Sequence, residues 1–430
     1  MALDEKTLDK VLHRGVSEII VEEEFVRLLK EGKPLRLKMG FDPSRPDIHL
    51  GHVVGLRKLR QLQDLGHKVI LIVGDWTGQI GDPSGQSVIR PMLTHEEVLA
   101  NADTYMAQFF KVVDKGRAET VLQSEWFEKF TLATVIDLTR RFTLAQFLER
   151  DDFSRRYKAN RPIAITEFLY PLLQAYDSVA IESDVEFGGT DQKFNLLVGR
   201  QLQTMMGQRP QQCFLMPMLV GTDGVKKMSK SLDNYVAVDD PPNDMYGKVM
   251  SISDNLIADY FNFLTDVPEG ELAEMRQSLE AGSGNPMEMK KALSLNITRQ
   301  FHGDKEALGA QSYFQQAIQR RQTPEDIPSV GFLIEGAEGE YKHRFTPFAQ
   351  DGSESIVVVS PTRGRLDTAD LLHALGLASS RSEGRRLLSQ GAVEVDQAKH
   401  AAPSVEIGDG TVIKVGRRRF ARLVDLSKRG

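Results

Sequence analysis

The stretch Gly40-Phe41-Asp42-Pro43-Ser44, followed by His49-Leu50-Gly51-His52, decides how the N-terminal half of the chain folds. An apolar run over residues 35–39 ends at this turn, and a helix then begins with two histidines three residues apart. Residues at i and i+3 share one helix face, so both imidazoles should lie near the positive end of the helix dipole. Such a helix start is a favourable place to bind phosphate.

A pair of histidines at this spacing could also bind a metal ion. No cysteine, third histidine or nearby glutamate accompanies the pair to complete a ligand set. Its position after a strand and a turn favours the phosphate interpretation, and we expect no metal site built by the protein. Gly51 removes side-chain bulk where a base or a ribose could approach the backbone.

Strands and helices are expected to alternate from Leu35 to Leu219. Residues 69–73 read Val-Ile-Leu-Ile-Val, the continuous apolar run of a buried parallel strand. Further strands are expected at 119–123, 185–189 and 213–219, and helices cover most of the sequence between them. This alternation predicts an α/β fold with a doubly wound parallel (Rossmann-like) sheet, whose ligand lies at the carboxyl ends of the strands.

The pattern divides the chain into four parts. Residues 1–225 are expected to form the α/β domain, and 226–322 a basic loop followed by a helical domain. Residues 323–362 hold several Gly, Pro and Ser residues and are expected to form a linker with some short strands. Residues 363–430 are expected to form a small α+β domain.

Charge is distributed unevenly along the chain. The 430 residues carry a net charge of −6, yet the part from Arg363 onward holds 13 Lys and Arg against 8 Asp and Glu. An acidic body of net −11 therefore precedes a tail of net +5. Such a tail is a candidate footprint for RNA or DNA.

The composition also bounds the cellular setting. Cys213 is the only cysteine, which excludes an internal disulfide and a cysteine-based metal site. No apolar run reaches the length of a membrane span, and the N-terminus lacks the layout of a signal peptide. We expect a cytoplasmic protein that does not contact the membrane.

A second motif, Lys226-Lys227-Met228-Ser229-Lys230-Ser231, follows a strand and the turn Gly221-Thr222-Asp223-Gly224. Two lysines three residues apart in a glycine-bounded loop can close over a polyphosphate. For an isolated pair of this kind, a solvated basic loop is the commoner explanation. The histidine motif, far earlier in the chain and before the sheet, changes that balance.

The two motifs together resemble the signatures of class I aminoacyl-tRNA synthetases, and their context resembles the bacterial tyrosyl-tRNA synthetases. The matching segments are Gly40-Phe41-Asp42-Pro43, Gly81-Asp82-Pro83-Ser84-Gly85, Tyr170-x-x-x-Gln174-x-x-Asp177 and Gly188-Gly189-Thr190-Asp191-Gln192. The tail, with Arg381-Ser382-Glu383-Gly384-Arg385-Arg386 and Gly391-Ala392-Val393-Glu394-Val395, resembles the S4-type RNA-binding module. The resemblance spans the whole chain.

Tyr170, Gln174 and Asp177 stand at i, i+4 and i+7, so they share one helix face, and a carboxylate beside an amide suits an amino acid with a polar tip. The resemblance implies that Asp177 accepts the phenol hydroxyl of tyrosine and that Tyr170, Gln174 and Asp82 hold its ammonium group. It places Gln192 at the substrate carboxylate and Asp42 near both substrates.

For ATP, the resemblance implies a binding set and a catalytic set. Asp191 and Gly189 would meet the ribose, and the two lysines would clamp the leaving pyrophosphate during in-line attack on the α-phosphorus. The binding residues are Gly51, Gly189, Asp191, Met228, Ser229 and Lys230; the catalytic residues are His49, His52, Lys227, Lys230, Ser44 and Arg90. ATP is a substrate, and magnesium is expected to accompany it.

Two positions depart from the common family pattern. Lys38 stands where many members have a tyrosine that helps to bind the phenol. Gln86 follows Gly85 directly, at a position where the family commonly has a lysine.

RNA contact is expected at Arg381, Arg385 and Arg386 because arginines suit phosphate binding. The resemblance implies that tRNA(Tyr) is the partner, that 241–321 form the anticodon-side domain and that the chain is a homodimer. The apolar helical region 132–148 is the candidate dimer face.

Two alternative functions remain at the level of sequence. The first is a tryptophanyl-tRNA synthetase, which Asp177 and the S4-like tail disfavour. The second is a non-catalytic RNA-binding homologue, which the intact histidine and lysine motifs disfavour.

Overall fold

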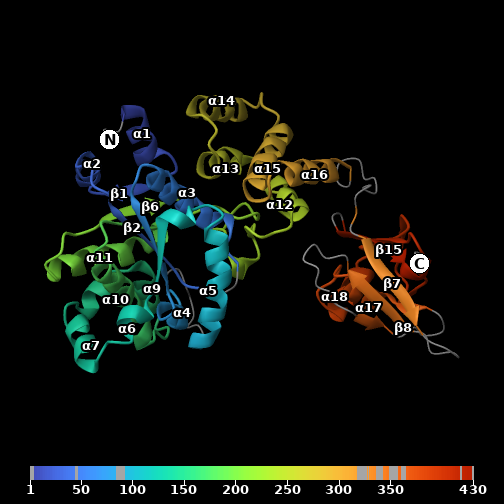
Figure 1. The fold of residues 1–430 in the computed structure, drawn as a ribbon, viewed down its shortest axis with the longest axis horizontal. Coiled ribbons are helices and arrows are strands. Elements are labelled where there is room, and N and C mark those ends of the chain that lie inside the picture. The colour runs from blue at the N-terminus through green and yellow to red at the C-terminus, as the bar shows by residue number, and fades with distance from the viewer. Residues whose placement is uncertain are drawn as a thin grey trace. The chain divides into compact units, whose positions relative to one another are not determined.

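The computed structural model describes residues 4–43, 47–83, 93–316, 327, 329–335, 342–347, 357–359, 365–416 and 419–428. The chain forms two compact units, Met1–Ala307 and Leu308–Gly430 (Figure 1).

A six-stranded sheet forms the centre of the described part of the N-terminal unit. Its order is β1-β6-β5-β2-β3-β4, in which all neighbours are parallel except β1, which is antiparallel to β6. The strands are β1 (Glu18–Ile20), β2 (Arg36–Phe41), β3 (Lys68–Val73), β4 (Ala118–Leu122), β5 (Val185–Gly189) and β6 (Gln212–Met216). The parallel strands confirm the predicted doubly wound fold. Strand β1 lies before Leu35, where the strands were expected to begin, and was not predicted.

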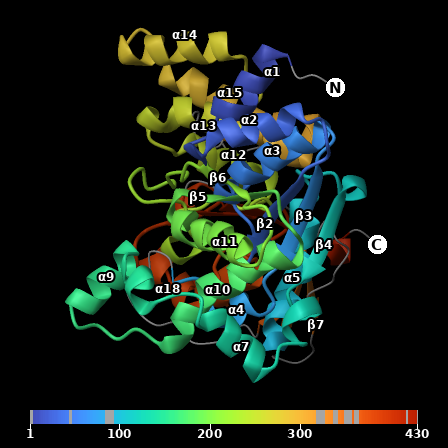
Figure 2. The ribbon, with the colours of Figure 1, turned by 90° about the vertical axis from the view of Figure 1, so that its left-hand side faces the viewer.

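Helices connect the parallel strands, as the alternation predicted. The connection from β2 to β3 is α3, and the one from β5 to β6 is α11, which lies beside α10 (Figure 2). The helices are α1 (Glu5–His13), α2 (Glu22–Lys30), α3 (Leu50–Asp64), α4 (Thr77–Ile80), α5 (His95–Phe109), α6 (Ser124–Phe127), α7 (Leu132–Thr139), α8 (Leu144–Leu148), α9 (Asp151–Lys158), α10 (Ile165–Ala180) and α11 (Lys193–Met205).

Two helix ends follow directly from their sequence signals. Thr94 Oγ1 accepts the backbone N–H of Glu97, whose carboxylate accepts that of Thr94, which is the capping box that the sequence pattern Thr-x-x-Glu at 94–97 indicates at the start of α5. After the carboxyl end of α3, Gly66 adopts a φ of 95°, a conformation that a residue with a side chain rarely adopts.

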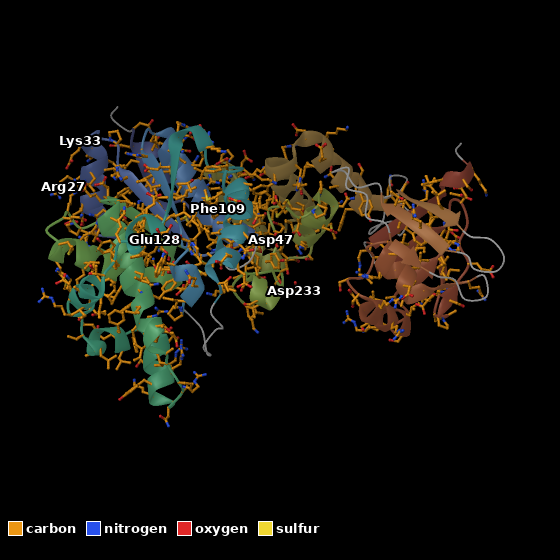
Figure 3. All side chains as sticks on the ribbon, turned by 60° about the horizontal axis from the view of Figure 1, so that its bottom comes forward. Arg27, Lys33, Asp47, Phe109, Glu128 and Asp233 are labelled. Carbon is orange, nitrogen blue, oxygen red and sulfur yellow. The ribbon has the colours of Figure 1, made fainter. Side chains whose placement is uncertain are left out.

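The core between α5 and the sheet is built from aromatic and aliphatic side chains. Phe109 of α5 packs on Phe41 at the end of β2, with ring centroids 4.0 Å apart. Figure 3 shows Phe109 within the densely packed body of the unit, whereas Arg27 and Lys33 lie at its edge. This packing fixes the carboxyl end of β2, from which the site described below begins.

After residue 241 the N-terminal unit is helical, as predicted. The helices are α12 (Pro242–Met250), α13 (Ile257–Leu264), α14 (Glu269–Glu280), α15 (Pro286–His302) and α16 (Asp304–Phe314), the last of which continues into the second unit. Among the described residues, no helix is both long and apolar enough to cross a membrane.

The second unit differs from the expected linker plus tail domain. Three strands within 323–362 join the sheet of the tail, because β7 pairs in parallel with β15. The sheet order is β12-β11-β14-β15-β7-β8-β9, beside the separate pair β10-β13. The elements are β7 (Ser329–Glu335), β8 (Lys342–Pro347), β9 (Val357–Val359), β10 (Leu366–Asp367), α17 (Thr368–Ala374), α18 (Arg381–Ser389), β11 (Val393–Val395), β12 (Ala398–Lys399), β13 (Ser404–Val405), β14 (Val412–Val415) and β15 (Arg419–Asp425).

Candidate active site

The strand order reverses between β2 and β5, and the candidate site lies at the carboxyl ends of these two strands. Asp42 follows β2 directly, and Asp191 and Gln192 follow β5 in a 3₁₀ turn (Thr190–Gln192). In open α/β sheets, ligands bind where the strand order reverses, since the connecting segments diverge there and leave a crevice.

The paired histidines begin α3 and cap its first turn. The Nδ1 atom of His49 accepts the backbone N–H of Gly51, and the Nδ1 atom of His52 accepts that of His49. Since an Nδ1 atom that accepts cannot carry a proton in the neutral ring, each Nε2 carries the hydrogen and is a donor. The pair therefore presents N–H donors to an anionic ligand.

Both imidazoles are held in the neutral form. Burial lowers the pKa of His49 well below its usual value, helped by the neighbouring His52 and by the charges of Lys230 and Lys227. Burial and the charge of Lys230 lower the pKa of His52 to about 3. The donors are consequently neutral imidazoles near pH 7, and the positive charge of the site comes from the lysines.

The segment that follows the lysine loop lies against the histidine helix. The backbone N–H of Leu50 donates to the carbonyl of Val236 at 3.0 Å, and His49 forms an isolated bridge with Ala237. A Cβ atom on Gly51 would approach the ring of His49 to 2.9 Å, so a side chain at this position would crowd that ring. The two motifs, distant in sequence, are thus brought together by backbone contacts.

Both motif lysines of the loop contact side chains that lie earlier in the sequence. Lys227 Nζ lies 2.7 Å from Asp191 Oδ2, and Lys230 Nζ donates to the hydroxyl of Tyr105. Met228 is buried, and the Ser229 hydroxyl accepts the N–H of Ser231 to start a 3₁₀ turn (Lys230–Leu232). Lys227 therefore pairs with Asp191, the carboxylate that the resemblance assigns to the ATP ribose.

Asn234 holds the shape of this loop and was not predicted. Its side-chain oxygen accepts the N–H of Ser229 at 2.8 Å, and its amide donates to Asp223 and to the carbonyl of Lys227. Its side chain is buried. A buried amide that bonds both flanks of a loop could have been suspected only from the structure, because Asn is common in turns for local reasons.

On the other side of the crevice, α10 presents the predicted polar face. Tyr170 donates its hydroxyl proton to Asp42 at 2.8 Å, and Thr77 donates to the other oxygen of Asp42 at 2.7 Å. Burial and the carboxylates of Asp42 and Asp82 raise the pKa of Tyr170 well above its ordinary value. Tyr170 therefore keeps its proton and fixes Asp42 between two donors.

Asp177 is the deepest carboxylate of this face, with 2% of its surface exposed. It accepts from Gln123 Nε2 at 2.8 Å and from Trp126 Nε1 at 3.2 Å. Burial raises its pKa to about 7, against opposing effects that include the charge of Lys38 and these two hydrogen bonds. Gln123 and Trp126 were not predicted, although both follow the carboxyl end of β4, where site residues are expected.

The remaining predicted residues form one hydrogen-bonded group. Gln192 Nε2 donates to Asp82 Oδ2 at 2.5 Å, and the buried Asn195 donates to the side-chain oxygens of both Gln174 and Gln192. Lys38, the departure noted in the sequence, is fully buried and pairs with Glu186 at 2.9 Å. It does not reach into the crevice as a free cation.

The described residues do not include Ser44, Arg90 or Gln86, the second departure from the family pattern. Gly189 ends β5, and a Cβ there would approach Asp191 Oδ1 to 2.7 Å. Within the described ranges, no cluster of three or more His, Cys, Asp or Glu side chains could hold a metal ion.

In the C-terminal unit, the three predicted arginines lie on α18. Arg381, Arg385 and Arg386 are exposed, and the first and last pair with Asp370 and Glu383. The side chain of Arg419 bonds the carbonyl of Leu377.

A doubly wound parallel sheet whose switch point joins a histidine pair to a lysine loop defines the catalytic core of the class I aminoacyl-tRNA synthetases. The family model for class I tRNA synthetases (W and Y) matches residues 30–319, and the chain belongs to this family. The S4 domain model matches residues 365–413.

Curated relatives match the chain over nearly its whole length. The chain is 52% identical to a tyrosine–tRNA ligase of Dehalococcoides mccartyi over 420 residues, 98% of this chain and 99% of the relative. It is 48% identical to that of Thermotoga maritima, covering 96% of each chain. The structure of tyrosyl-tRNA synthetase with L-tyrosine from Archaeoglobus fulgidus aligns with a TM-score of 0.59 and 25% identity, over 71% of this chain and 99% of that chain.

The raised pKa of Asp177 predicts a pH-dependent stability. A carboxyl whose pKa is higher in the folded state stabilises the fold at low pH, and this contribution is lost as the pH rises from its ordinary pKa of 3.8 to about 7. Asp177→Asn cannot ionise, so its free energy of unfolding relative to the unsubstituted protein should improve by about 2 kcal/mol between pH 5 and pH 8.

Denaturant unfolding of both proteins at the two pH values measures this difference. The control is Asp137→Asn, which removes a half-exposed carboxylate on α7. The same improvement in the control, or none in Asp177→Asn, would contradict the assignment.

Proposed function

We propose that the chain attaches tyrosine to tRNA(Tyr) in two steps at this site. Tyrosine first reacts with ATP to give tyrosyl-adenylate and pyrophosphate, and the terminal ribose of the tRNA then takes the tyrosyl group. The observation that carries the proposal is that two chemically different sets of side chains meet at the carboxyl ends of β2 and β5. The acceptor wall is the set of hydrogen-bond acceptors on and around α10, and the donor wall is the set of imidazole donors and lysine cations.

The acceptor wall suits the two polar ends of tyrosine. Asp177 would accept the phenol hydroxyl, and the side-chain oxygens of Tyr170, Gln174 and Asp82 would accept the ammonium group. Phenylalanine would leave Asp177 with only its bonds from Gln123 and Trp126, and a buried carboxylate that lacks a further donor is costly. Tyrosyl-tRNA synthetases are themselves the established example of this selection, which in that family is known to reach roughly 10⁵-fold.

The donor wall suits the triphosphate. The tyrosine carboxylate would attack the α-phosphorus in line, and negative charge would move to the departing pyrophosphate. His49 and His52 would donate from Nε2 to phosphate oxygens, and Lys227 and Lys230 would neutralise the leaving group. No covalent enzyme intermediate is needed, so catalysis rests on positioning and electrostatic stabilisation.

Lys227 and the ATP ribose would compete for the carboxylate of Asp191. The ribose hydroxyls of ATP would take over Asp191, which releases Lys227 toward the phosphates. Binding of ATP through its ribose would thereby free Lys227 to neutralise the departing pyrophosphate. Gln192 would contact the substrate carboxylate, and Asp42 would lie between the two substrates.

Magnesium would enter with the ATP phosphates as part of the substrate, held by phosphate oxygens rather than by a protein cage. The reaction needs tRNA and free tyrosine, both of which are present in the bacterial cytoplasm, and we place the protein there. The named relatives are tyrosine–tRNA ligases, so the tryptophan alternative is not favoured. The histidine donors and the loop lysines argue against a non-catalytic homologue.

The C-terminal unit would bind the tRNA. The S4 match supports RNA contact, and α18 offers three exposed arginines on one short helix. The part predicted to be helical, 241–321, would lie on the anticodon side.

We also propose a homodimer. Large apolar side chains are exposed on α7, on α8 and at the start of α10: Leu132 (75%), Ile136 (55%), Leu144 (60%) and Ile165 (77%). Exposed apolar residues of this size favour an interface, and the first three lie in the region 132–148 predicted from the sequence. A second copy of the chain would cover it.

The lysine loop can be tested by pyrophosphate exchange into ATP. Lys230→Ala should lower the rate of tyrosine-dependent exchange by about 100-fold and leave tyrosine binding within about twofold, because the lysine acts on the leaving group.

Exposed Lys226→Ala, earlier in the same loop, is the control and should stay near the unsubstituted rate. Equal losses of rate and tyrosine affinity in Lys230→Ala would refute the clamp. Exchange with tryptophan and none with tyrosine would overturn the proposed function itself.

The arginines of α18 can be tested by tRNA charging. Arg385→Gln with Arg386→Gln should raise the KM for tRNA by about tenfold at about 150 mM salt and reduce its salt dependence, while exchange without tRNA stays unchanged. Lys6→Gln with Lys30→Gln removes the same charge from the N-terminal unit and serves as the control. An unchanged KM for tRNA would exclude α18 from the RNA contact.

The dimer face can be tested by sedimentation. Leu132→Glu with Ile136→Glu should convert the dimer to a monomer, because burying two carboxylates at an apolar interface is strongly unfavourable. Met287→Glu changes an exposed apolar residue on α15 and should leave the dimer intact. A double variant that still sediments as a dimer would place the interface elsewhere.

A further inference from the structure

Lys38 and Glu186 form a fully buried ion pair on neighbouring parallel strands, and the reaction described above assigns neither of them a role. Lys38 is 0% exposed and Glu186 1%. A buried pair of this kind contributes little net stability compared with apolar residues of the same size. Its value to the protein should therefore be sought in what it holds in place.

All the hydrogen-bonding capacity of the Lys38 ammonium group is used. Nζ donates to the carbonyl of Gln174 at 2.7 Å and to Ser178 Oγ at 2.8 Å, and it lies 2.9 Å from Glu186 Oε1. The first two contacts are one helical turn apart on α10. The ammonium group therefore ties β2 to the turn of α10 that carries Gln174.

Glu186 is surrounded by donors only. Oε1 accepts from Lys38 and from Gln174 Nε2 at 3.1 Å, and Oε2 accepts from Ser178 Oγ at 3.3 Å and from Gln211 Nε2. A carboxyl with four donors has no position left for a proton, so it must be a carboxylate, which only accepts. The adjacent Lys38 balances its charge.

A carboxylate at this place decides which way the amide of Gln174 faces. Only the Nε2 end can turn toward an acceptor, so Oε1 must face the opposite side. There it accepts from Asn195 Nδ2 at 3.0 Å, and an amide oxygen can accept a second hydrogen bond.

A second cation fixes the same direction from the other end. Arg150 Nη1 donates to Asn195 Oδ1 at 3.1 Å, which leaves the Asn195 amide to donate to Gln174 and to Gln192 Oε1 at 3.1 Å. Arginine can only donate, so Asn195 cannot turn. The buried relay thus donates in one direction from Arg150 through Asn195 and Gln174 to Glu186, and Lys38 donates to Glu186 from the other side.

We propose that Lys38 and Glu186 are positioning residues that orient the Gln174 amide so that its oxygen receives the α-ammonium group of tyrosine. This inference rests on the proposed function, because it deepens the role assigned to Gln174. Without the pair, Asn195 alone would hold the amide, which could then turn and present an N–H group to the ammonium group and repel it.

The test compares two ligands that differ only in that ammonium group. Tyrosine carries it, and 3-(4-hydroxyphenyl)propanoate does not. Equilibrium dialysis should show that Lys38→Met with Glu186→Gln weakens tyrosine binding by about tenfold or more, while the affinity for the propanoate changes by less than about twofold. The double variant leaves no unpaired buried charge and should fold.

A matched control removes an ion pair at the rim of the same sheet. Lys68→Met with Glu119→Gln makes the same two changes on β3 and β4, where both partners are about half exposed. It should bind both ligands as the unsubstituted protein does. The KM for ATP should be unchanged in both double variants, which separates an effect on the ammonium site from general disruption.

Two outcomes would overturn the inference. Equal weakening of tyrosine and the propanoate would show that the pair supports the site only as a whole. A double variant that keeps the full preference for tyrosine would show that the pair does not orient Gln174. An unsubstituted protein that binds neither ligand would instead refute the proposed function.

Discussion

The reversal of strand order between β2 and β5 is the constraint on which the rest of the structure depends. The chain leaves β2 toward α3 and β3, and it leaves β5 toward α11 and β6, so the two connections diverge. The histidine pair follows the first strand, and Asp191 and Gln192 follow the second. Groups that are distant in sequence, such as His49 and Asp191, thereby line one crevice.

Each wall of the crevice is fixed in its hydrogen-bond polarity before a ligand arrives. At the start of α3, backbone N–H groups occupy both Nδ1 atoms, so the imidazoles are donors. Next to α10, Lys38 and Arg150 fix the two ends of the buried relay through Asn195 and Gln174. The hydrogen-bonding positions left on the relay's amide oxygens are therefore acceptors. Preorganisation of this kind lowers the reorganisation that binding and catalysis would otherwise require.

The features that local patterns determine could be predicted from the sequence, whereas those that depend on contacts between distant segments could not. Alternating strands and helices indicated the doubly wound sheet, and Thr94 with Glu97 indicated a helix start. The meeting of the histidine and lysine motifs came from the family resemblance, because neither motif alone is specific. By contrast, Lys38 is an unexplained charge in a strand until Glu186, on the neighbouring strand, is seen beside it. Strands β7 to β9 lie in the part expected to be a linker with some short strands. That they join the sheet of the tail could not be predicted, since their partner β15 comes only at the end of the chain and strand pairing is non-local.

The most direct measurement is a crystal structure of the protein with tyrosine and a non-hydrolysable ATP analogue. The account predicts the phenol hydroxyl on Asp177, the ammonium group on the oxygen of Gln174, and the ribose on Asp191, with Lys227 moved to the phosphates. A ligand bound in this crevice with Lys227 still on Asp191, or with the amide nitrogen of Gln174 facing the ammonium group, would contradict it.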